Sequence, residues 1–318
     1  MPFVEKAGLP GREVAALTVT MLDGEPRLRL DVASAPSGQG HETSLSRIVA
    51  RQLGAPVDEV EVHFGDSSRG ASGIGTFASR SGTYTGSAVH RAAEQLTKTL
   101  AELAGATPEC DARVEWPAVN GKDGQNIASI ADCVRSNGGE IAVHGEYDSA
   151  RHTYPFGTVT CHVTVDPEML TVTVNRLALT CDVGEPIDRD IVIGQLIGGA
   201  AQGIGGALLE ELAYDQDGNP LASGLAEYLV PHAADLPDID VELFRSPDDG
   251  TPDTAPNPLM AKGIGEAGIA AVAAACGSAI CNAIPELTEE LTELPMDPSR
   301  LWGAQQRARG RRAEKERR

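Results

Sequence analysis

Apolar and polar side chains alternate along residues 14–21 and 27–32, and this period of two predicts a pair of half-buried strands. A helical period follows over residues 43–53, and a third alternating stretch covers residues 60–64. Ser87 is expected to cap a second helix, which ends near Gly105. This succession of strands and helices predicts an α/β unit.

The second half of the chain repeats this kind of order. Strands are predicted over residues 158–165 and 170–180, and a long helix is predicted over residues 190–211. Two shorter strands are expected at residues 225–229 and 241–244, where prolines interrupt the pattern. A second α/β unit is therefore expected after the first.

Turn signals dominate residues 107–152, so this stretch is predicted to be an irregular connector. We therefore expect an α+β fold with two α/β subdomains, residues 1–106 and 153–305, each with a mixed sheet and flanking helices. A last helix is expected to begin at Asp297, with proline at its first helical position, and to lead into a basic tail over residues 306–318.

One part of the long helix is apolar enough to suggest a membrane span. Residues 191–209 are 19 residues without a charge, a length that could cross a bilayer. The run also contains Gln195, Gln202 and six glycines, which lower its hydrophobicity. A buried, closely packed helix is the preferred interpretation, and no membrane span is expected.

The charge distribution excludes one class of partner. The chain has 318 residues and a formal net charge of -20, but residues 307–318 hold seven Arg or Lys and two Glu, which leaves -25 on the rest. An acidic body is unsuited to binding nucleic acid phosphates. The basic tail is most simply a solvated or frayed helix end, and docking to another subunit is the alternative.

The six cysteines have no spacing typical of a zinc or iron–sulfur site. An iron–sulfur centre would need four organised thiolates, so any such centre is expected on another subunit. The first 14 residues carry charges and no apolar core, so no secretory signal is expected and the cytoplasm is the expected location.

Two glycine-rich loops carry candidate chemistry. Glu266 ends the segment Lys262-Gly263-Ile264-Gly265-Glu266 and is expected in, or just before, the first turn of an apolar helix. A carboxylate on such a loop suits a general base, although an acid also complements a helix dipole. The second loop, residues 37–43, contains Gly-Gln-Gly, which suits close approach to a ligand or simply a tight turn.

Five motifs resemble, in order, the carboxyl-terminal half of the large subunit of the xanthine dehydrogenase, aldehyde oxidase and carbon monoxide dehydrogenase family. Any single motif would be weak, but five at compatible spacing are specific. They are Gly38-Gln39-Gly40-His41-Glu42-Thr43, Ser79-Arg80-Ser81, Asp182-Val183-Gly184, Gly194-Gln195 with Ala201-Gln202-Gly203-Ile204-Gly205, and Lys262-Gly263-Ile264-Gly265-Glu266. The family's Ile-Asn-Pro after the aspartate is here Ile187-Asp188-Arg189.

The resemblance implies the fold of the second molybdopterin-binding domain of molybdenum hydroxylases. It also implies a molybdopterin cofactor, in bacterial members usually the cytosine dinucleotide form, whose dithiolene holds the molybdenum, so no metal ligand is expected from the protein. Glu266 is implied as the catalytic base. The residues implied in cofactor binding are Gln39, Gly40, His41, Thr43, Ser79, Arg80, Ser81, Thr83, Asp182, Gln195, Gln202, Lys262, Gly263, Ile264 and Gly265.

Large subunits of this family also have an amino-terminal half, which is absent from this sequence. We therefore expect one part of a split large subunit, similar to the medium subunit of nicotinate dehydrogenase, or else a fragment of a longer chain. The implied partners are a second molybdopterin-binding subunit, a 2Fe-2S subunit and an FAD subunit. The implied reaction is hydroxylation of an N-heterocycle or aldehyde with oxygen from water; carbon monoxide oxidation or a non-catalytic scaffold are the alternatives.

Overall fold

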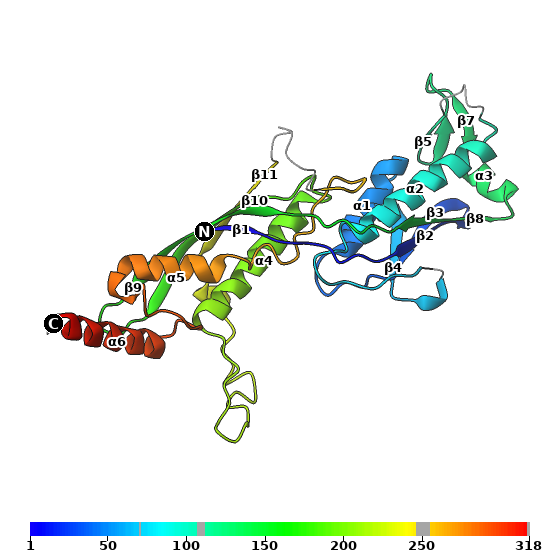
Figure 1. The fold of residues 1–318 in the computed structure, drawn as a ribbon. Coiled ribbons are helices and arrows are strands. Elements are labelled where there is room, and N and C mark those ends of the chain that lie inside the picture. The colour runs from blue at the N-terminus through cyan, green and yellow to red at the C-terminus, as the bar shows by residue number, and fades with distance from the viewer. Residues whose placement is uncertain (70, 107–111, 246–254, 317–318) are drawn as a thin grey trace.

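The protein has two lobes arranged end to end, as the computed structural model in Figure 1 shows. The structure describes residues 1–69, 71–106, 112–245 and 255–316. Each lobe is built on a four-stranded mixed sheet with helices packed against it, and a small third sheet extends the first lobe. The predicted α+β class, with two α/β subdomains, is confirmed by this architecture.

The first lobe contains a sheet with the strand order β4-β3-β2-β8. Strand β2 pairs antiparallel with β3 and β8, and β3 pairs parallel with β4. Helices α1 and α2 cover this sheet with apolar side chains such as Leu45 and Leu96, which are fully or almost fully buried. The bounds are β2 Glu13–Leu22, β3 Glu25–Val32, α1 His41–Leu53, β4 Val60–Phe64, α2 Tyr84–Leu103 and β8 Glu140–Tyr147.

The strands and the first helix expected in this lobe are confirmed, but the start predicted for the second helix was wrong. Helix α2 begins at Tyr84, after Thr83, and Ser87 lies inside its first turn. The Ser87 hydroxyl donates a hydrogen bond to the Thr83 carbonyl instead of capping the helix. The helix therefore begins four residues earlier than predicted, where the Tyr84 ring packs in the core of the lobe.

Residues 107–152 are not an irregular connector, although residues 107–111 lie outside the described part. Strand β8 belongs to the first sheet, and its inward side chains include Ile141 and Val143. Gly145 takes the next inward position because α2 lies directly against it, so the apolar alternation is broken in the sequence. The other elements are β5 Arg113–Glu115, β6 Ala118–Asn120, β7 Asn126–Ser129 and α3 Ile130–Ser136.

The second lobe contains a sheet with the strand order β1-β9-β10-β11. Strand β1 lies in this sheet although it comes first in the chain, and the amino group of Met1 donates to the Val159 carbonyl at 2.6 Å. The first residues therefore belong to the second lobe. The bounds are β1 Pro2–Val4, β9 Phe156–Val165, β10 Val172–Asp182, α4 Arg189–Leu208, β11 Asp238–Phe244, α5 Val272–Ala283 and α6 Pro298–Glu316.

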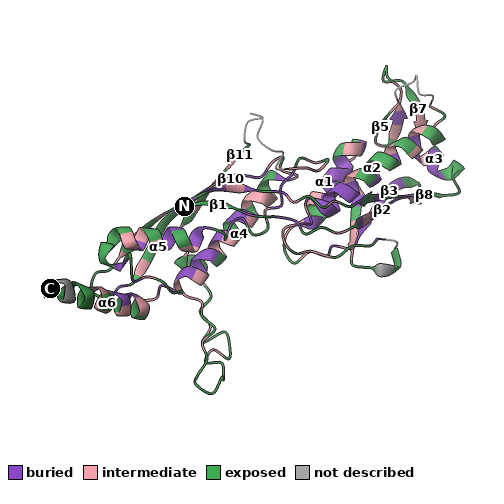
Figure 2. Cartoon of the chain, viewed as in Figure 1, coloured by how far each residue is buried: buried purple, intermediate pink, exposed green. Residues whose placement is uncertain are grey.

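The expected strands on either side of residues 166–169, the long helix and the last helix are confirmed. The strand expected at 225–229 is absent from the described residues of that segment, which forms turns, whereas β11 includes the expected 241–244. Residues 209–232 instead form an arm that leaves the lobe, and most of its residues are exposed (Figure 2). Prolines and glycines in the arm exclude a regular ladder.

Helix α4 passes the length and composition test for a membrane span, the one helix among the described residues to do so. Its mean hydropathy is 1.4, and 33% of its apolar 18-residue stretch is buried inside the protein. Gly203 of α4 lies so close to α5 that an added Cβ would be 2.6 Å from the Cβ of Val272. Close packing through glycine is also typical of a helix in a protein core. Length and composition alone are therefore weak support for a membrane span.

Candidate functional site

A cavity of about 210 Å³ lies at the junction of the two lobes. Its wall is built from segments that are far apart in the sequence: the start of α1, the loop before α2, the start of α4 and the loop before α5. Among the candidate residues, its lining includes Gln39, His41, Ser79, Arg80, Ser81, Gln195, Lys262, Gly263, Ile264, Gly265 and Glu266. The glycine-rich loops therefore meet at one place.

Glu266 lies on this wall and is exposed. Its backbone amide donates to the Ser79 hydroxyl at 3.1 Å, so a residue of the first lobe fixes its position. Residues 265–271 form turns, and α5 begins only at Val272. Glu266 is therefore not in the first turn of the helix, and a helix-dipole role has less support than the sequence indicated.

The loop that carries Glu266 is packed tightly against the loop before α2. A Cβ at Gly263 would lie 1.9 Å from the Ser79 carbonyl oxygen, and a Cβ at Gly265 would lie 3.0 Å from its hydroxyl. Ala78 and Ser79 both have left-handed backbone conformations, with φ of 47° and 53°. Strain of this kind persists where the surroundings impose it and often marks a functional site.

The start of α1 contributes a polar edge to the cavity. Gly40 directly precedes the helix and has a left-handed backbone with φ of 69°. A Cβ atom at this position would lie 2.9 Å from the Cδ1 atom of Ile191. Gln39 accepts a hydrogen bond from the Ser37 amide at 2.6 Å. His41 is buried, and its Nδ1 has no hydrogen-bond partner among the described residues. Burial lowers the pKa of His41, so its ring is neutral near pH 7.

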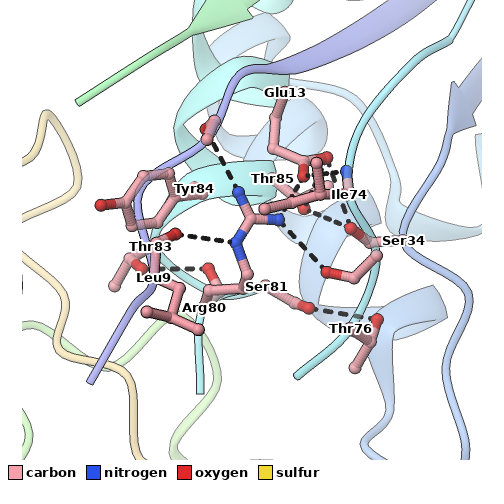
Figure 3. Close-up of polar contacts among 12 residues, drawn as sticks. Leu9, Glu13, Ser34, Ile74, Thr76, Arg80, Ser81, Thr83, Tyr84 and Thr85 are labelled. Carbon is pink, nitrogen blue, oxygen red and sulfur yellow. Dashed lines mark hydrogen bonds and ion pairs between the residues drawn. The ribbon is translucent and has the colours of Figure 1, made fainter. Parts of the chain in front are cut away.

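The guanidinium of Arg80 is buried against the protein, contrary to the cofactor contact that the resemblance implied. The side chain is fully buried, forms an ion pair with Glu13 and donates to the carbonyls of Leu9, Gly11 and Gly75 (Figure 3). Arg80 therefore holds the loop to the first sheet. Arg80 is still part of the cavity lining, so it shapes the wall of the cavity.

Several other candidate residues also have structural partners. Asp182 and Lys262 form a buried ion pair at 3.1 Å, and the Lys262 ammonium lies 4.8 Å from the ring centre of Phe156. The Lys262 amide also donates to the Val183 carbonyl, so this pair secures the Glu266 loop to the end of β10. The Thr83 hydroxyl donates to the Arg80 carbonyl. These side chains position the cavity wall.

Gly40, Thr43, Thr83, Asp182 and Gln202 are not part of the cavity lining. Thr43 and Gln202 are exposed on α1 and α4, respectively. They stay candidates only for contacts outside the cavity.

Two acidic residues near the cavity were not among the candidates predicted from the sequence. Asp188 lines it, caps α4 by accepting from the amides of Asp190 and Ile191, and pairs with Arg47 at 2.9 Å. An aspartate directly before an apolar helix is a capping signal that could have revealed it. The second is Glu5, a buried residue directly after β1, for which the local sequence gives no signal.

The chain is similar to several curated and solved proteins. It is 32% identical over 313 residues to the 6-hydroxypseudooxynicotine dehydrogenase complex subunit gamma of Paenarthrobacter nicotinovorans, covering 94% of this chain and 38% of that one. It is 30% identical over 279 residues to the nicotine 6-hydroxylase large subunit of the same organism, covering 83% and 34%.

The crystal structure of quinoline 2-oxidoreductase from Pseudomonas putida 86 has the same fold, with a TM-score of 0.82 and 27% identity, over 96% of this chain and 41% of that one. The chain thus spans about two fifths or less of the length of these relatives. Residues 1–237 match the family model described as a molybdopterin cofactor-binding domain. The loops that meet at the cavity and this match lead to one conclusion: the chain belongs to the molybdopterin cofactor-binding domain family.

Proposed function

We propose that this chain is the molybdopterin-binding, base-carrying part of a molybdenum hydroxylase. The observation that carries the proposal is the position of Glu266 on the wall of a cavity that the Gln39 and Ser79 loops also form. The proposed reaction is hydroxylation of an N-heterocycle with oxygen from water. The names of the relatives, which refer to nicotine and quinoline, favour an N-heterocycle over an aldehyde.

The residues of the cavity fit a large polar cofactor. Gln39 and Gln195 offer amide groups that donate and accept, Ser81 offers a hydroxyl, and His41 offers an unpartnered ring nitrogen. The start of α1 supplies backbone amides suited to an anionic group. Because Lys262 is already paired with Asp182, we propose that these mostly neutral donors, rather than a free cation, hold the cofactor in its cytosine dinucleotide form.

The protein itself would supply no metal ligands. Within the described ranges there is no group of three or more His, Cys, Asp or Glu side chains that could hold a metal ion. When bound, the cofactor would supply the centre that activates oxygen from water and accepts the substrate's electrons.

Glu266 has the features of a general base in this reaction. Glu266 is exposed on the cavity wall, and its backbone amide donates to the Ser79 hydroxyl, which holds the loop that presents the carboxylate. It would accept the proton that the oxygen nucleophile loses as it attacks the substrate. Gln39 and Gln195 would orient the cofactor from the other walls.

We propose further that the chain acts with partner subunits. The relatives are named as a gamma subunit of a complex and as a large subunit, and they are more than twice as long. The described cysteines form no disulfide, and none of them belongs to a group of three or more possible metal ligands among the described residues, so we propose that any iron–sulfur cluster lies on another subunit. The proposed partners are a second molybdopterin-binding subunit, a 2Fe-2S subunit and an FAD subunit.

The origin of the product oxygen tests the proposed reaction. The complex purified through this chain is supplied with N-heterocycles and aldehydes in water labelled with oxygen-18, and products are analysed by mass spectrometry. We expect the oxygen gained by the product to carry the label. Label that enters from oxygen-18 gas and not from water would contradict a molybdenum hydroxylase, and no oxygenated product from any substrate would favour the scaffold alternative.

A further inference from the structure

Cys161 and Cys276 are two cysteines whose thiols touch inside the second lobe. Cys161 lies on β9 and Cys276 on α5, and their Sγ atoms are 3.7 Å apart although the residues are 115 positions apart in the sequence. Among the five cysteines of the described residues, this is the one pair of thiols in contact. The fold therefore brings two thiols together that no local sequence pattern connects.

The packing around the pair is apolar and does not by itself require sulfur. Cys161 takes an inward position of β9 between Val159 and Val163, which pack in the same core. Cys276 lies on the buried face of α5, as Val272 does. One free cysteine can fill such a place as a small apolar side chain. Two cysteines in direct contact also meet the first requirement of a disulfide, which is closeness.

Only a short approach of the two sulfur atoms separates this contact from a bond. A disulfide has an S–S distance of about 2.05 Å, so the present separation of 3.7 Å would have to shorten by about 1.7 Å. Helix α5 packs directly on β9. We therefore expect rotation of the two side chains, with a small shift of α5 toward the sheet, to close the bond.

The two thiols differ in their access to solvent. Cys276 is 0% exposed, whereas Cys161 is half-buried. The hydrogen bond with Cys276 also lowers the pKa of the Cys161 thiol, because it stabilises the thiolate. The thiolate is the reactive form of a cysteine, so a small oxidant from solution would react with Cys161 first.

We propose that Cys161 and Cys276 form a reversible oxidation site for a small peroxide, in which Cys161 reacts first and Cys276 resolves the product. The Cys161 thiolate attacks one oxygen of hydrogen peroxide, the O–O bond breaks, and Cys161 becomes a sulfenic acid while hydroxide leaves and takes up a proton. The Cys276 sulfur then attacks the Cys161 sulfur, and a second water leaves as the S–S bond forms. In total, two thiols lose two electrons and one peroxide is reduced to two waters.

The bond would have two consequences for the chain. It would tie α5, the helix that follows the Glu266 loop, to β9 and close a loop of 115 positions, which restricts the unfolded chain and stabilises the folded one. It would also protect Cys161, because a sulfenic acid without a resolving thiol is oxidised further to an irreversible sulfinic acid. Neither consequence depends on the proposed role of Glu266.

The test treats the complex purified through this chain with hydrogen peroxide, without denaturant. Remaining thiols are blocked with iodoacetamide as the chain is denatured, and peptide mapping by mass spectrometry locates the bond. In the wild type we expect one linked pair, Cys161 with Cys276, and the loss of two hydrogen atoms. Dithiothreitol should reverse the link. The melting temperature of the chain should rise on oxidation and return on reduction.

Variants separate the roles of the two thiols. In Cys276→Ser, Cys161 has no resolving partner and should gain two oxygen atoms, a change that dithiothreitol does not reverse. In Cys161→Ser, the buried Cys276 should stay a free thiol. Cys281→Ser changes another cysteine of α5 and is the matched control, which should link Cys161 to Cys276 as the wild type does.

Several results would overturn the proposal. They are free thiols at both positions in the wild type after peroxide treatment, a bond that forms only after denaturation, and a bond from Cys161 to a different cysteine. Oxidation of Cys276 in Cys161→Ser would contradict the order of the steps. The mapping of the wild type requires no variant to fold and no turnover, so the proposal can fail while the proposed function stands.

Discussion

Glu266→Gln is expected to lower the turnover of the assembled complex by about 10²- to 10⁴-fold, the usual effect of losing a general base. Glutamine keeps the size and the hydrogen-bonding capacity of the side chain but cannot accept a proton. The Glu266 backbone amide would still donate to Ser79, so the loop should keep its place. Cofactor content and the unfolding free energy should therefore change little.

A structural role for Glu266 gives a different result. An acid that only complements a helix dipole contributes at most about 1 kcal/mol to stability and nothing to the rate. Turnover, molybdenum content and melting temperature should be measured on one preparation, with the exposed Glu168→Gln as control. Normal turnover of Glu266→Gln at full molybdenum occupancy would end its assignment as the base.

Arg80→Ala should destabilise the chain by about 3–5 kcal/mol, because it leaves the charge of Glu13 buried without compensation. Side-chain exposure in this ion pair is 0% for Arg80 and 1% for Glu13. The guanidinium also binds three backbone carbonyls, and its carbon lies 4.8 Å from the centre of the Tyr84 ring. These contacts join the start of β2 to the loop that bears Ser79, so cofactor content should fall as well.

The surface pair Arg12–Glu146 provides a control in the same part of the sheet. Its side chains are 58% and 50% exposed, so Arg12→Ala should change the unfolding free energy little. Both variants should be compared by chemical denaturation of the full chain. An equal, small effect of Arg12→Ala and Arg80→Ala would show that the buried pair does not hold this loop.

Local patterns in the sequence predicted most of the regular elements, and the failures have identifiable causes. Strand β8 was missed because Gly145 replaces an apolar residue where α2 approaches the sheet. The pairing of β1 with β9 joins residues that are about half the chain apart, and no local periodicity reports such a contact. The start of α2 depends on the burial of Tyr84, which is a tertiary effect.

In the candidate site, too, local motifs predicted some residues correctly, whereas roles that depend on distant parts of the chain were not predicted. The sequence motifs indicated three loops that do line one cavity. Thr43 is two residues after His41, which is about 200° around the helix, so it faces away from the cavity that His41 lines. Gln202 is seven residues after Gln195 on nearly the same helix face, but about 10 Å further along the axis. The role of Arg80 depends on Glu13, a partner far away in the sequence, so a sequence motif could not reveal it.

The molybdenum content of cavity variants tests the central claim most directly, namely that this cavity binds the cofactor. The chain is purified with its partners as wild type, as Gln195→Trp, which places a large ring in the cavity, and as Gln202→Trp, which alters an exposed position on the same helix. We predict stoichiometric molybdenum and pterin in the wild type and in Gln202→Trp, and a loss of both in Gln195→Trp with the complex intact. Full molybdenum in Gln195→Trp, or none in the wild-type complex, would contradict the account.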